Sequence, residues 1–235
     1  MTPLADRDEL AACRPAILGA TGFGLYQLFE SRRDGFPAVF DRVVFDEASQ
    51  VLVPQALLAL CYGRGNVVFA GDVRQLPPIV LGRYPEPELG RSILAHLLHR
   101  YEPAHRVRLD TTYRMNAALC RFPGETWYEG TLRPAPGNAG RRLDPPRPGT
   151  GGGRRDDLLD RVLDPERPVA LLLADHHGCH QQSDLEVEIV ARLAVRLMAE
   201  YGLGAEQIAL ISPHRAQNNA LAERLRRLVP GGALP

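Results

Sequence analysis

The stretch from residue 40 to residue 78 constrains the fold of this chain more than any other part. Two short apolar runs, 43–45 and 67–70, lead into acidic residues, and a Leu- and Ala-rich run of helical length, 51–62, separates them. Strand, helix and strand in this order are typical of a parallel α/β sheet. Because such sheets bind ligands at the carboxyl ends of their strands, the polar residues there are candidate site residues.

The residues after the two apolar runs suit phosphoryl transfer. Asp46 ends a strand as a Walker B aspartate does, where the carboxylate helps to hold Mg²⁺ against phosphate oxygens. Mg²⁺ keeps several waters, so one firm carboxylate suffices. Glu47 can accept a proton from an attacking water. Gln75 can hydrogen-bond a γ-phosphate or that water. The pattern predicts a site for ATP and Mg²⁺.

Composition narrows the setting of that chemistry. The chain has 235 residues, which is enough for one large or two modest domains. Its formal net charge is zero, so any nucleic-acid surface has to be local. The cysteines are widely spaced and form no CxxC pair, which argues against a zinc ribbon or a disulfide framework. With neither a signal peptide nor a membrane-length apolar run, we expect a cytoplasmic protein without a membrane partner.

Three motifs carry a resemblance to a known family. DEASQ at 46–50 and GDVRQLPP at 71–78 resemble motifs II and III of superfamily 1 helicases, most closely the branch that contains the nonsense-mediated-decay helicase and senataxin. TYRM at 112–115 resembles motif IV of that branch, whose usual core is QYRM. The second and third of these motifs argue against a different, AAA-type P-loop ATPase.

The resemblance implies an α/β fold with two RecA-like parallel-sheet domains of the P-loop NTPase type, both incomplete. Residues 1–84 are expected to form the C-terminal part of the first domain, and residues 85–235 the N-terminal part of the second. A Pro-, Gly- and Arg-rich segment near 134–157 is expected to be a flexible loop, and its arginines are interpreted as exposed rather than as phosphate contacts.

Further elements follow from apolar patterning in the second half. Short strands are expected at 107–109, 168–174 and 207–213. Helices are expected at 93–100, after a capping Ser92, and at 183–201, where apolar residues recur at four-residue steps.

The resemblance also assigns roles around the nucleotide. Asp46 is expected to hold Mg²⁺, Glu47 to activate water and Gln75 to sense the γ-phosphate. Arg114 is expected to stabilise charge in the transition state. Tyr113 would lie near the base, and Glu186 would contact the sugar. The alternative for Glu186 is a capping box with Ser183 at a helix start.

A second group of residues is expected to contact single-stranded DNA or RNA without reading its sequence, through hydroxyl, amide and helix N-terminal groups. It comprises Thr21, Pro77, Ser212 and Gln217. A short strand that begins at residue 16 is expected to end at Thr21, and this threonine is equally compatible with a helix cap. The cluster of His176, His177, Cys179 and His180 lacks the separated ligand pairs of a structural zinc site.

One element of such a motor cannot lie in this sequence. A Walker A loop, GxxxxGK[ST], needs a lysine, and this chain has none. The loop is expected further upstream, and the chain stops before the arginine of motif VI is expected. Three interpretations follow. The chain is a fragment of a helicase that couples ATP hydrolysis to translocation and unwinding, and the fragment alone is expected to be inactive. Otherwise it is a subunit completed by a polypeptide carrying the missing motifs, or a catalytically dead module that binds nucleic acid or protein.

Overall fold

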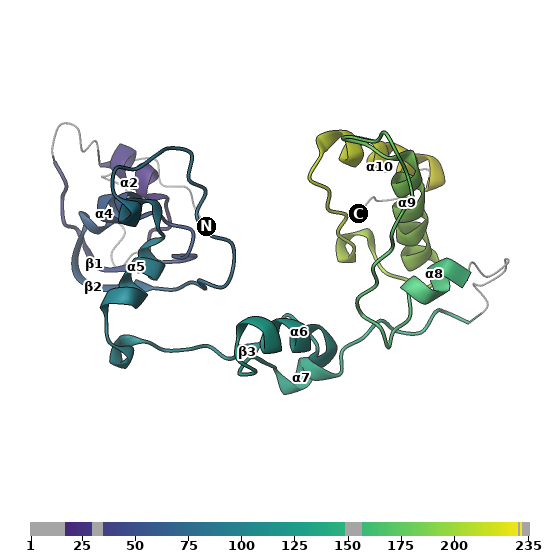
Figure 1. Cartoon of the computed structure of the whole chain (residues 1–235), viewed down its shortest axis with the longest axis horizontal. Helices are drawn as coiled ribbons and strands as arrows, with labels where there is room; N and C mark the ends of the chain where they lie inside the picture. Colours follow the sequence, from purple (N-terminus) through teal and green to yellow (C-terminus); the bar gives the residue numbers. More distant parts are fainter. Residues whose placement is uncertain (1–16, 30–34, 149–156, 230, 232–235) are drawn as a thin grey trace. The chain divides into compact units, whose positions relative to one another are not determined.

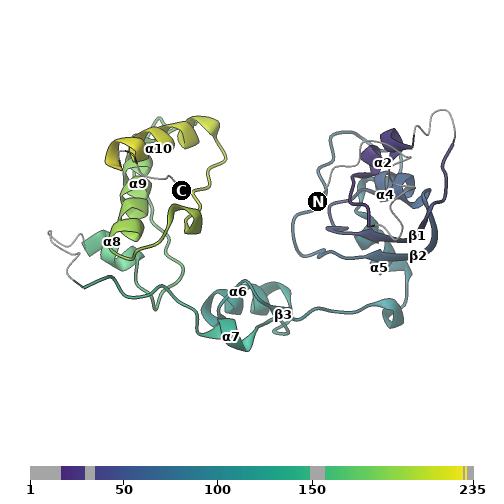
Figure 2. The same ribbon diagram turned by 180° about the vertical axis from the view of Figure 1, so that it is seen from behind.

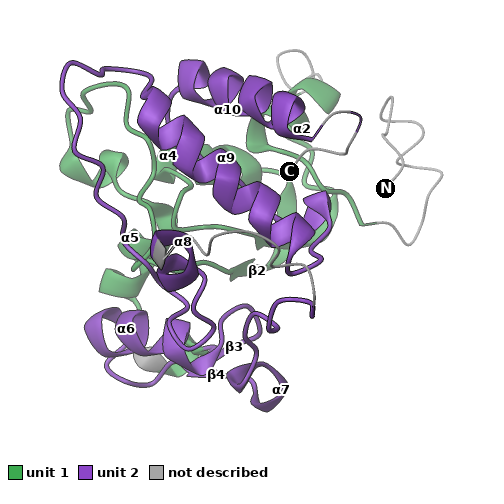
Figure 3. Ribbon diagram, turned by 90° about the vertical axis from the view of Figure 1, so that its right-hand side faces the viewer, with its two compact units in different colours: residues 1–108 green, residues 109–235 purple. Residues whose placement is uncertain are grey.

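A computed structural model describes residues 17–29, 35–148, 157–229 and 231 (Figure 1). The chain divides into two compact units, residues 1–108 and residues 109–235, which have different colours in Figure 3. No helix in these described ranges is long and apolar enough to cross a membrane.

Unit 1 is built on a pair of parallel strands. β1 (Phe40–Phe45) and β2 (Gly63–Phe69) pair in parallel, and α4 (Val53–Leu60) connects them. The register sets Val43 beside Val67 and Phe45 beside Phe69, whose rings stack with centroids 4.8 Å apart. The predicted strand, helix and strand are therefore confirmed, as is a parallel α/β arrangement in this unit.

One face of this strand pair carries the core of unit 1. α4 buries Val53, Ala56 and Ala59 in a cluster with Phe45. α2 (Gly22–Leu28) lies beside α4, as both Figure 1 and Figure 2 show. On the strands themselves, Val44 is 65% exposed and Val68 is 52% exposed. Parallel sheets usually bury both faces. Among the described residues, no element covers the second face of this strand pair.

The end of unit 1 packs back on the same core. It contains the 3₁₀ turns η1 (Pro87–Gly90) and η2 (Pro103–His105), with α5 (Ile93–Arg100) between them. Ser92 caps α5 as predicted, since its Oγ accepts from Ala95 N at 3.1 Å. Ile93 N donates to Val51 O at 2.8 Å, and the Ile93 side chain joins the α4 cluster. For this reason residues up to Arg108 cluster with unit 1, whereas the expected division fell between 84 and 85.

The first half of unit 2 is a small α/β element. β3 (Thr111–Thr112) and β4 (Arg133–Pro134) pair in parallel, with α6 (Ala117–Trp127) between them in sequence. α7 (Pro136–Ala139) follows directly. The segment expected as a flexible loop thus begins with regular structure, while residues 149–156 lie outside the described ranges.

The second half of unit 2 is a helix pair. α8 (Asp157–Val162) precedes α9 (Asp184–Ala199), and η3 (Ala205–Gln207) precedes α10 (Arg215–Leu228). α9 confirms the predicted amphipathic helix. It packs on α10 through Ala191, Ala194 and Leu225. Both alanines are fully buried in this contact.

Three predicted strands are absent from the described structure. Residues 107–109, 168–174 and 207–213 form no β-strand. Leu171 and Leu173 are 85% and 84% exposed, and Ile211 is 93% exposed. Apolar patterning indicates a strand only where a neighbouring strand takes up its backbone hydrogen bonds, and the described residues offer these segments none.

Candidate functional site

The carboxylates of the DEASQ motif stand where β1 ends. Asp46 follows the strand directly, and its Oδ1 accepts from Glu47 N at 3.0 Å. Its other oxygen has no partner among the described residues, so an exposed oxygen ligand of the kind Mg²⁺ prefers is available. Glu47 has φ +50°, a left-handed conformation that costs an L-residue about 1 kcal/mol. Such strain is typical of functional positions.

The GDVRQLPP motif is held against DEASQ by a close backbone approach. A Cβ built on Gly71 would lie 2.8 Å from Ser49 N and 2.9 Å from Ala48 N, so only glycine fits there. Ala48 N also donates to Ala70 O at 2.8 Å. Beyond this contact, Gln75 Nε2 donates to Asp72 Oδ2 at 2.9 Å. The structure therefore brings the two predicted motifs together at the carboxyl edge of the strand pair.

A cavity of about 380 Å³ lies beside these motifs. Gln75 and Pro77 line it, together with apolar side chains that include Val73 and Leu76. Ser49 also lines it, and the buried Ser49 Oγ has no hydrogen-bond partner among the described residues. An apolar cavity with a few polar groups is the usual form of a small-ligand site.

Thr21 takes the helix-cap position that the sequence left open. Its Oγ1 accepts from Gly24 N at 3.0 Å at the start of α2. Residues 17–20 form no strand, so the expected strand leading to Thr21 is wrong in its described part. The capped side chain is exposed and its hydroxyl hydrogen remains available to a phosphate oxygen.

In unit 2, the TYRM motif forms a turn between β3 and α6. Arg114 N donates to Thr112 Oγ1 at 3.3 Å, and Tyr113 is 76% exposed. Asn116 then caps α6, because its Oδ1 accepts from Leu119 N at 2.8 Å. The turn thus carries the exposed phenol ring of Tyr113 and the Arg114 guanidinium, which has no carboxylate partner among the described residues, on a backbone held by hydrogen bonds.

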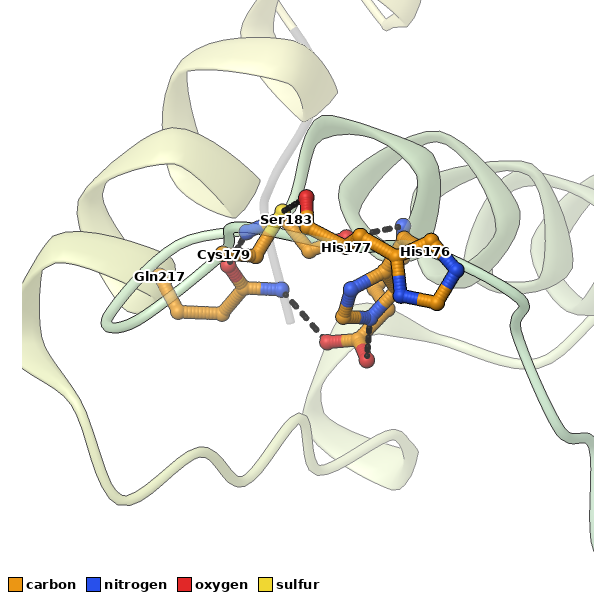
Figure 4. Close-up of polar contacts among 6 residues, drawn as sticks. His176, His177, Cys179, Ser183 and Gln217 are labelled. Carbon is orange, nitrogen blue, oxygen red and sulfur yellow. Dashed lines mark hydrogen bonds and ion pairs between the residues drawn. The ribbon is translucent and has the colours of Figure 1, made fainter.

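Glu186, in the first turn of α9, is held from two sides, by His176 and Gln217, which are labelled in Figure 4. His176 Nε2 lies 2.9 Å from Glu186 Oε1, and Gln217 Nε2 donates to Glu186 Oε2 at 3.3 Å. Ser183 Oγ accepts from Glu186 N at 3.4 Å, as the cap predicts. The reciprocal bond of a capping box is replaced, because Ser183 N donates to Gln217 Oε1 at 2.9 Å. This buried amide therefore joins α9 to α10.

One predicted residue, Ser212, lies outside this network, and one member of the network, His176, was not predicted to contact Glu186. Ser212, just before α10, accepts from His214 N through its Oγ at 3.3 Å. His176 was considered only as part of a cysteine and histidine cluster. No group of three or more metal-ligating side chains occurs within the described ranges. The spacing of His176 and Glu186 in the sequence does not predict their contact, because the contact depends on how the segment before α9 folds back.

Comparison with known proteins agrees with the motifs. One model described as an AAA domain matches residues 89–232, and another described as an AAA domain matches residues 21–83. The DNA-binding protein SMUBP-2 of Mesocricetus auratus is 29% identical over 203 residues, which cover 81% of this chain and 19% of the relative.

Two shorter matches point the same way. Helicase SEN1 of Saccharomyces cerevisiae is 33% identical over 99 residues, covering 42% of this chain and 4% of the relative. Regulator of nonsense transcripts 1 of Dictyostelium discoideum is 35% identical over 94 residues, covering 40% of this chain and 7% of the relative. The chain spans at most about a fifth of the length of these relatives.

Proposed function

This chain belongs to the superfamily 1 helicases with AAA domains, and we propose that it supplies part of the ATP-hydrolysing, nucleic-acid-translocating motor of such a helicase. Each unit is then part of a RecA-like domain. The observation that carries the proposal is the close backbone contact at Gly71, which holds two nucleotide-chemistry motifs at one strand edge.

Unit 1 supplies the hydrolytic groups in this proposal. Asp46 holds Mg²⁺, which when bound neutralises charge on the phosphates. Glu47, exposed and fixed in its strained backbone position, accepts the proton of the attacking water. Gln75 is hydrogen-bonded to Asp72 and therefore held in one orientation. From there its amide oxygen can accept a hydrogen bond from the attacking water, and its second N–H can donate to a γ-phosphate oxygen.

Unit 2 supplies groups for the rest of the nucleotide. Arg114 stabilises negative charge that builds up on the transferred phosphoryl group. The exposed ring of Tyr113 stacks near the base, and Glu186 accepts a hydrogen bond from the sugar. Since His176 and Gln217 hold both oxygens of Glu186, this carboxylate is positioned before the nucleotide arrives.

Single-stranded nucleic acid is the partner in this proposal. The hydroxyls of Thr21 and Ser212 and the apolar surface at Pro77 contact the strand, as in modules that hold phosphates without reading bases. Gln217 is 7% exposed, and both its amide oxygen and its amide nitrogen are already hydrogen-bonded. In this proposal it therefore supports the nucleic-acid site from within the network at the start of α10. SMUBP-2 is a DNA-binding protein by name, which supports nucleic acid as the partner class.

The absence of lysine from the sequence favours two forms of this function. In one, a polypeptide region outside these residues provides the Walker A lysine, and hydrolysis needs both parts. In the other, the chain is a catalytically dead module that binds nucleic acid or protein. Both retain nucleic-acid binding, and only the first retains turnover.

The test is ATP hydrolysis in the presence of single-stranded DNA or RNA, with and without an added polypeptide that carries GxxxxGK[ST]. The motor predicts negligible turnover by the chain alone and stimulated turnover by the pair, lost in Glu47→Gln and Arg114→Gln. Glu86→Gln, an exposed glutamate of unit 1, serves as the control and should leave the rate unchanged. Nucleic-acid binding without turnover in any combination would support the dead module.

A further inference from the structure

An arginine-rich cavity in unit 2 is not explained by the motifs. Its volume is about 330 Å³, and four arginines line it: Arg114, Arg141, Arg142 and Arg167. Among the described residues that line it, Asp164 is the one acidic residue. Cavities that hold small ligands begin at roughly 300 Å³, so this space suits a compact anion such as a polyphosphate.

Two of the four arginines are neutralised by neighbouring carboxylates. Arg142 forms an ion pair with Glu166, and Arg167 Nε lies 3.6 Å from Asp164 Oδ2. Arg114 and Arg141 have no carboxylate partner among the described residues. The described residues therefore leave the cavity with an excess of two positive charges, which favours a ligand with at least two negative charges.

Contacts of the Arg141 backbone and side chain place it beside the TYRM turn. Its main-chain oxygen accepts from Asn116 Nδ2 at 2.7 Å, and its Nη2 lies 3.4 Å from Tyr113 O. Asn138 Nδ2 also donates to Tyr113 O. Arg141 is thereby anchored to the residues on both sides of Arg114, although the two arginines are far apart in sequence.

The donor inventory fits a phosphate. A guanidinium has five N–H donors in a planar fork that matches phosphate oxygens. Arg141 uses one of these donors on Tyr113 O, and the Arg114 side chain makes no hydrogen bond among the described residues. Both forks line the same cavity, so together they can bind one phosphate group.

We propose that Arg114 and Arg141 together bind a phosphate group in this cavity. The inference rests on the proposed function only through Arg114, because Arg141 lies outside every motif used above. The phosphate comes from a nucleotide or from the backbone of a nucleic acid, which share the same recognition chemistry.

The primary experiment is isothermal titration of the whole chain with sodium tripolyphosphate at low salt in EDTA. Arg141→Gln and Arg114→Gln should each weaken binding roughly tenfold, the loss expected for one charge-assisted contact. The control is Arg226→Gln, which removes the same charge from an exposed site on α10 and should leave affinity unchanged. Wild-type affinity in Arg141→Gln, or an equal loss in Arg226→Gln, overturns the proposal.

A double variant shows whether both arginines hold the same group. If they do, Arg114→Gln with Arg141→Gln loses less affinity than the product of the single losses. Independent, multiplicative losses overturn the shared site. Arg141→Lys keeps the charge but not the fork and should recover part of the affinity, which separates lost contacts from lost folding.

Competition then identifies the source of the phosphate. Displacement of tripolyphosphate by ATP assigns the cavity to a nucleotide, and displacement by a single-stranded oligonucleotide assigns it to the nucleic-acid backbone. Displacement by neither overturns the site. The titration omits divalent cations and measures no turnover, so it tests binding separately from hydrolysis. If tripolyphosphate binding depends on Arg141 but the complex never hydrolyses ATP, only the proposed function is contradicted. Turnover with no such binding contradicts this inference alone.

Discussion

The Nε2 atom of Gln217 on α10 donates to Oε2 of Glu186 on α9 at 3.3 Å. The same amide accepts from Ser183 N through its oxygen at 2.9 Å. One buried side chain thus orients a candidate nucleotide-binding carboxylate and satisfies a main-chain donor at the start of α9. Its contribution to stability and its contribution to the site are therefore coupled.

Gln217→Leu should lower the free energy of unfolding by about 1–3 kcal/mol, because Ser183 N loses its partner in a buried setting. Denaturant unfolding followed by circular dichroism measures the loss. Asn219→Leu makes the same type of change at an exposed position of α10 and should have little effect. Equal stability of the two variants would show that the Gln217 bonds are not formed in solution.

Two buried serines in unit 1 should respond in opposite directions to alanine. Ser49 Oγ is buried without a partner, so Ser49→Ala removes a desolvated hydroxyl and should be neutral or stabilising by up to about 1 kcal/mol. Ser92 caps α5, and Ser92→Ala should cost about 1 kcal/mol. Thermal unfolding of both variants provides the comparison. A larger loss in Ser49→Ala than in Ser92→Ala would mean that Ser49 has a partner in solution.

Gly71→Ala should destabilise unit 1 by about 1–3 kcal/mol, because the added methyl group meets the backbone nitrogens of Ala48 and Ser49 rather than a flexible side chain. Gly82→Ala is the matched control, since a Cβ there meets nothing within 4 Å. Denaturant unfolding of the two variants measures the difference. If Gly71→Ala is as stable as Gly82→Ala, the two motifs are not in close contact.

The link between Glu188 and Arg224 predicts a pH dependence of the α9–α10 pair. Arg224 hydrogen-bonds Glu188 at 2.6 and 3.1 Å, and this bond, opposed in part by desolvation, holds the pKa of Glu188 below its usual 4.5. A carboxylate with a lowered folded-state pKa stabilises the fold above its unfolded-state pKa. That stability is lost as the pH falls from 4.5 through the lower value.

Glu188→Gln should therefore be less stable than the wild type at neutral pH, and the difference should shrink below pH 4.5. The effect is small because the pair is partly exposed to solvent. Unfolding free energies measured across this range provide the test, with Glu125→Gln, an exposed glutamate of α6, as the control. A gap between wild type and Glu188→Gln that stays constant with pH would rule out this ion pair.

Local patterns predicted the elements whose partners are near in sequence. The β1–α4–β2 unit, the Ser92 cap and α9 all follow from periodicity and capping chemistry, and the structure confirms them. The segments 107–109, 168–174 and 207–213 were predicted as strands and are not. Their apolar character is real, but strand formation depends on hydrogen bonds from a neighbouring strand, which no local pattern supplies.

The order of the residues is enough to show which chemistry is available: acidic and amide groups at strand ends, an arginine in a turn and no lysine anywhere. Tertiary structure alone decided which groups meet, such as Gln217 with Glu186, and Arg141 with the backbone beside Arg114. The physical reason is the distance along the chain over which each effect acts. Propensity and capping act over a few residues, whereas these contacts join positions more than twenty residues apart and exist only because packed helices and turns bring them together.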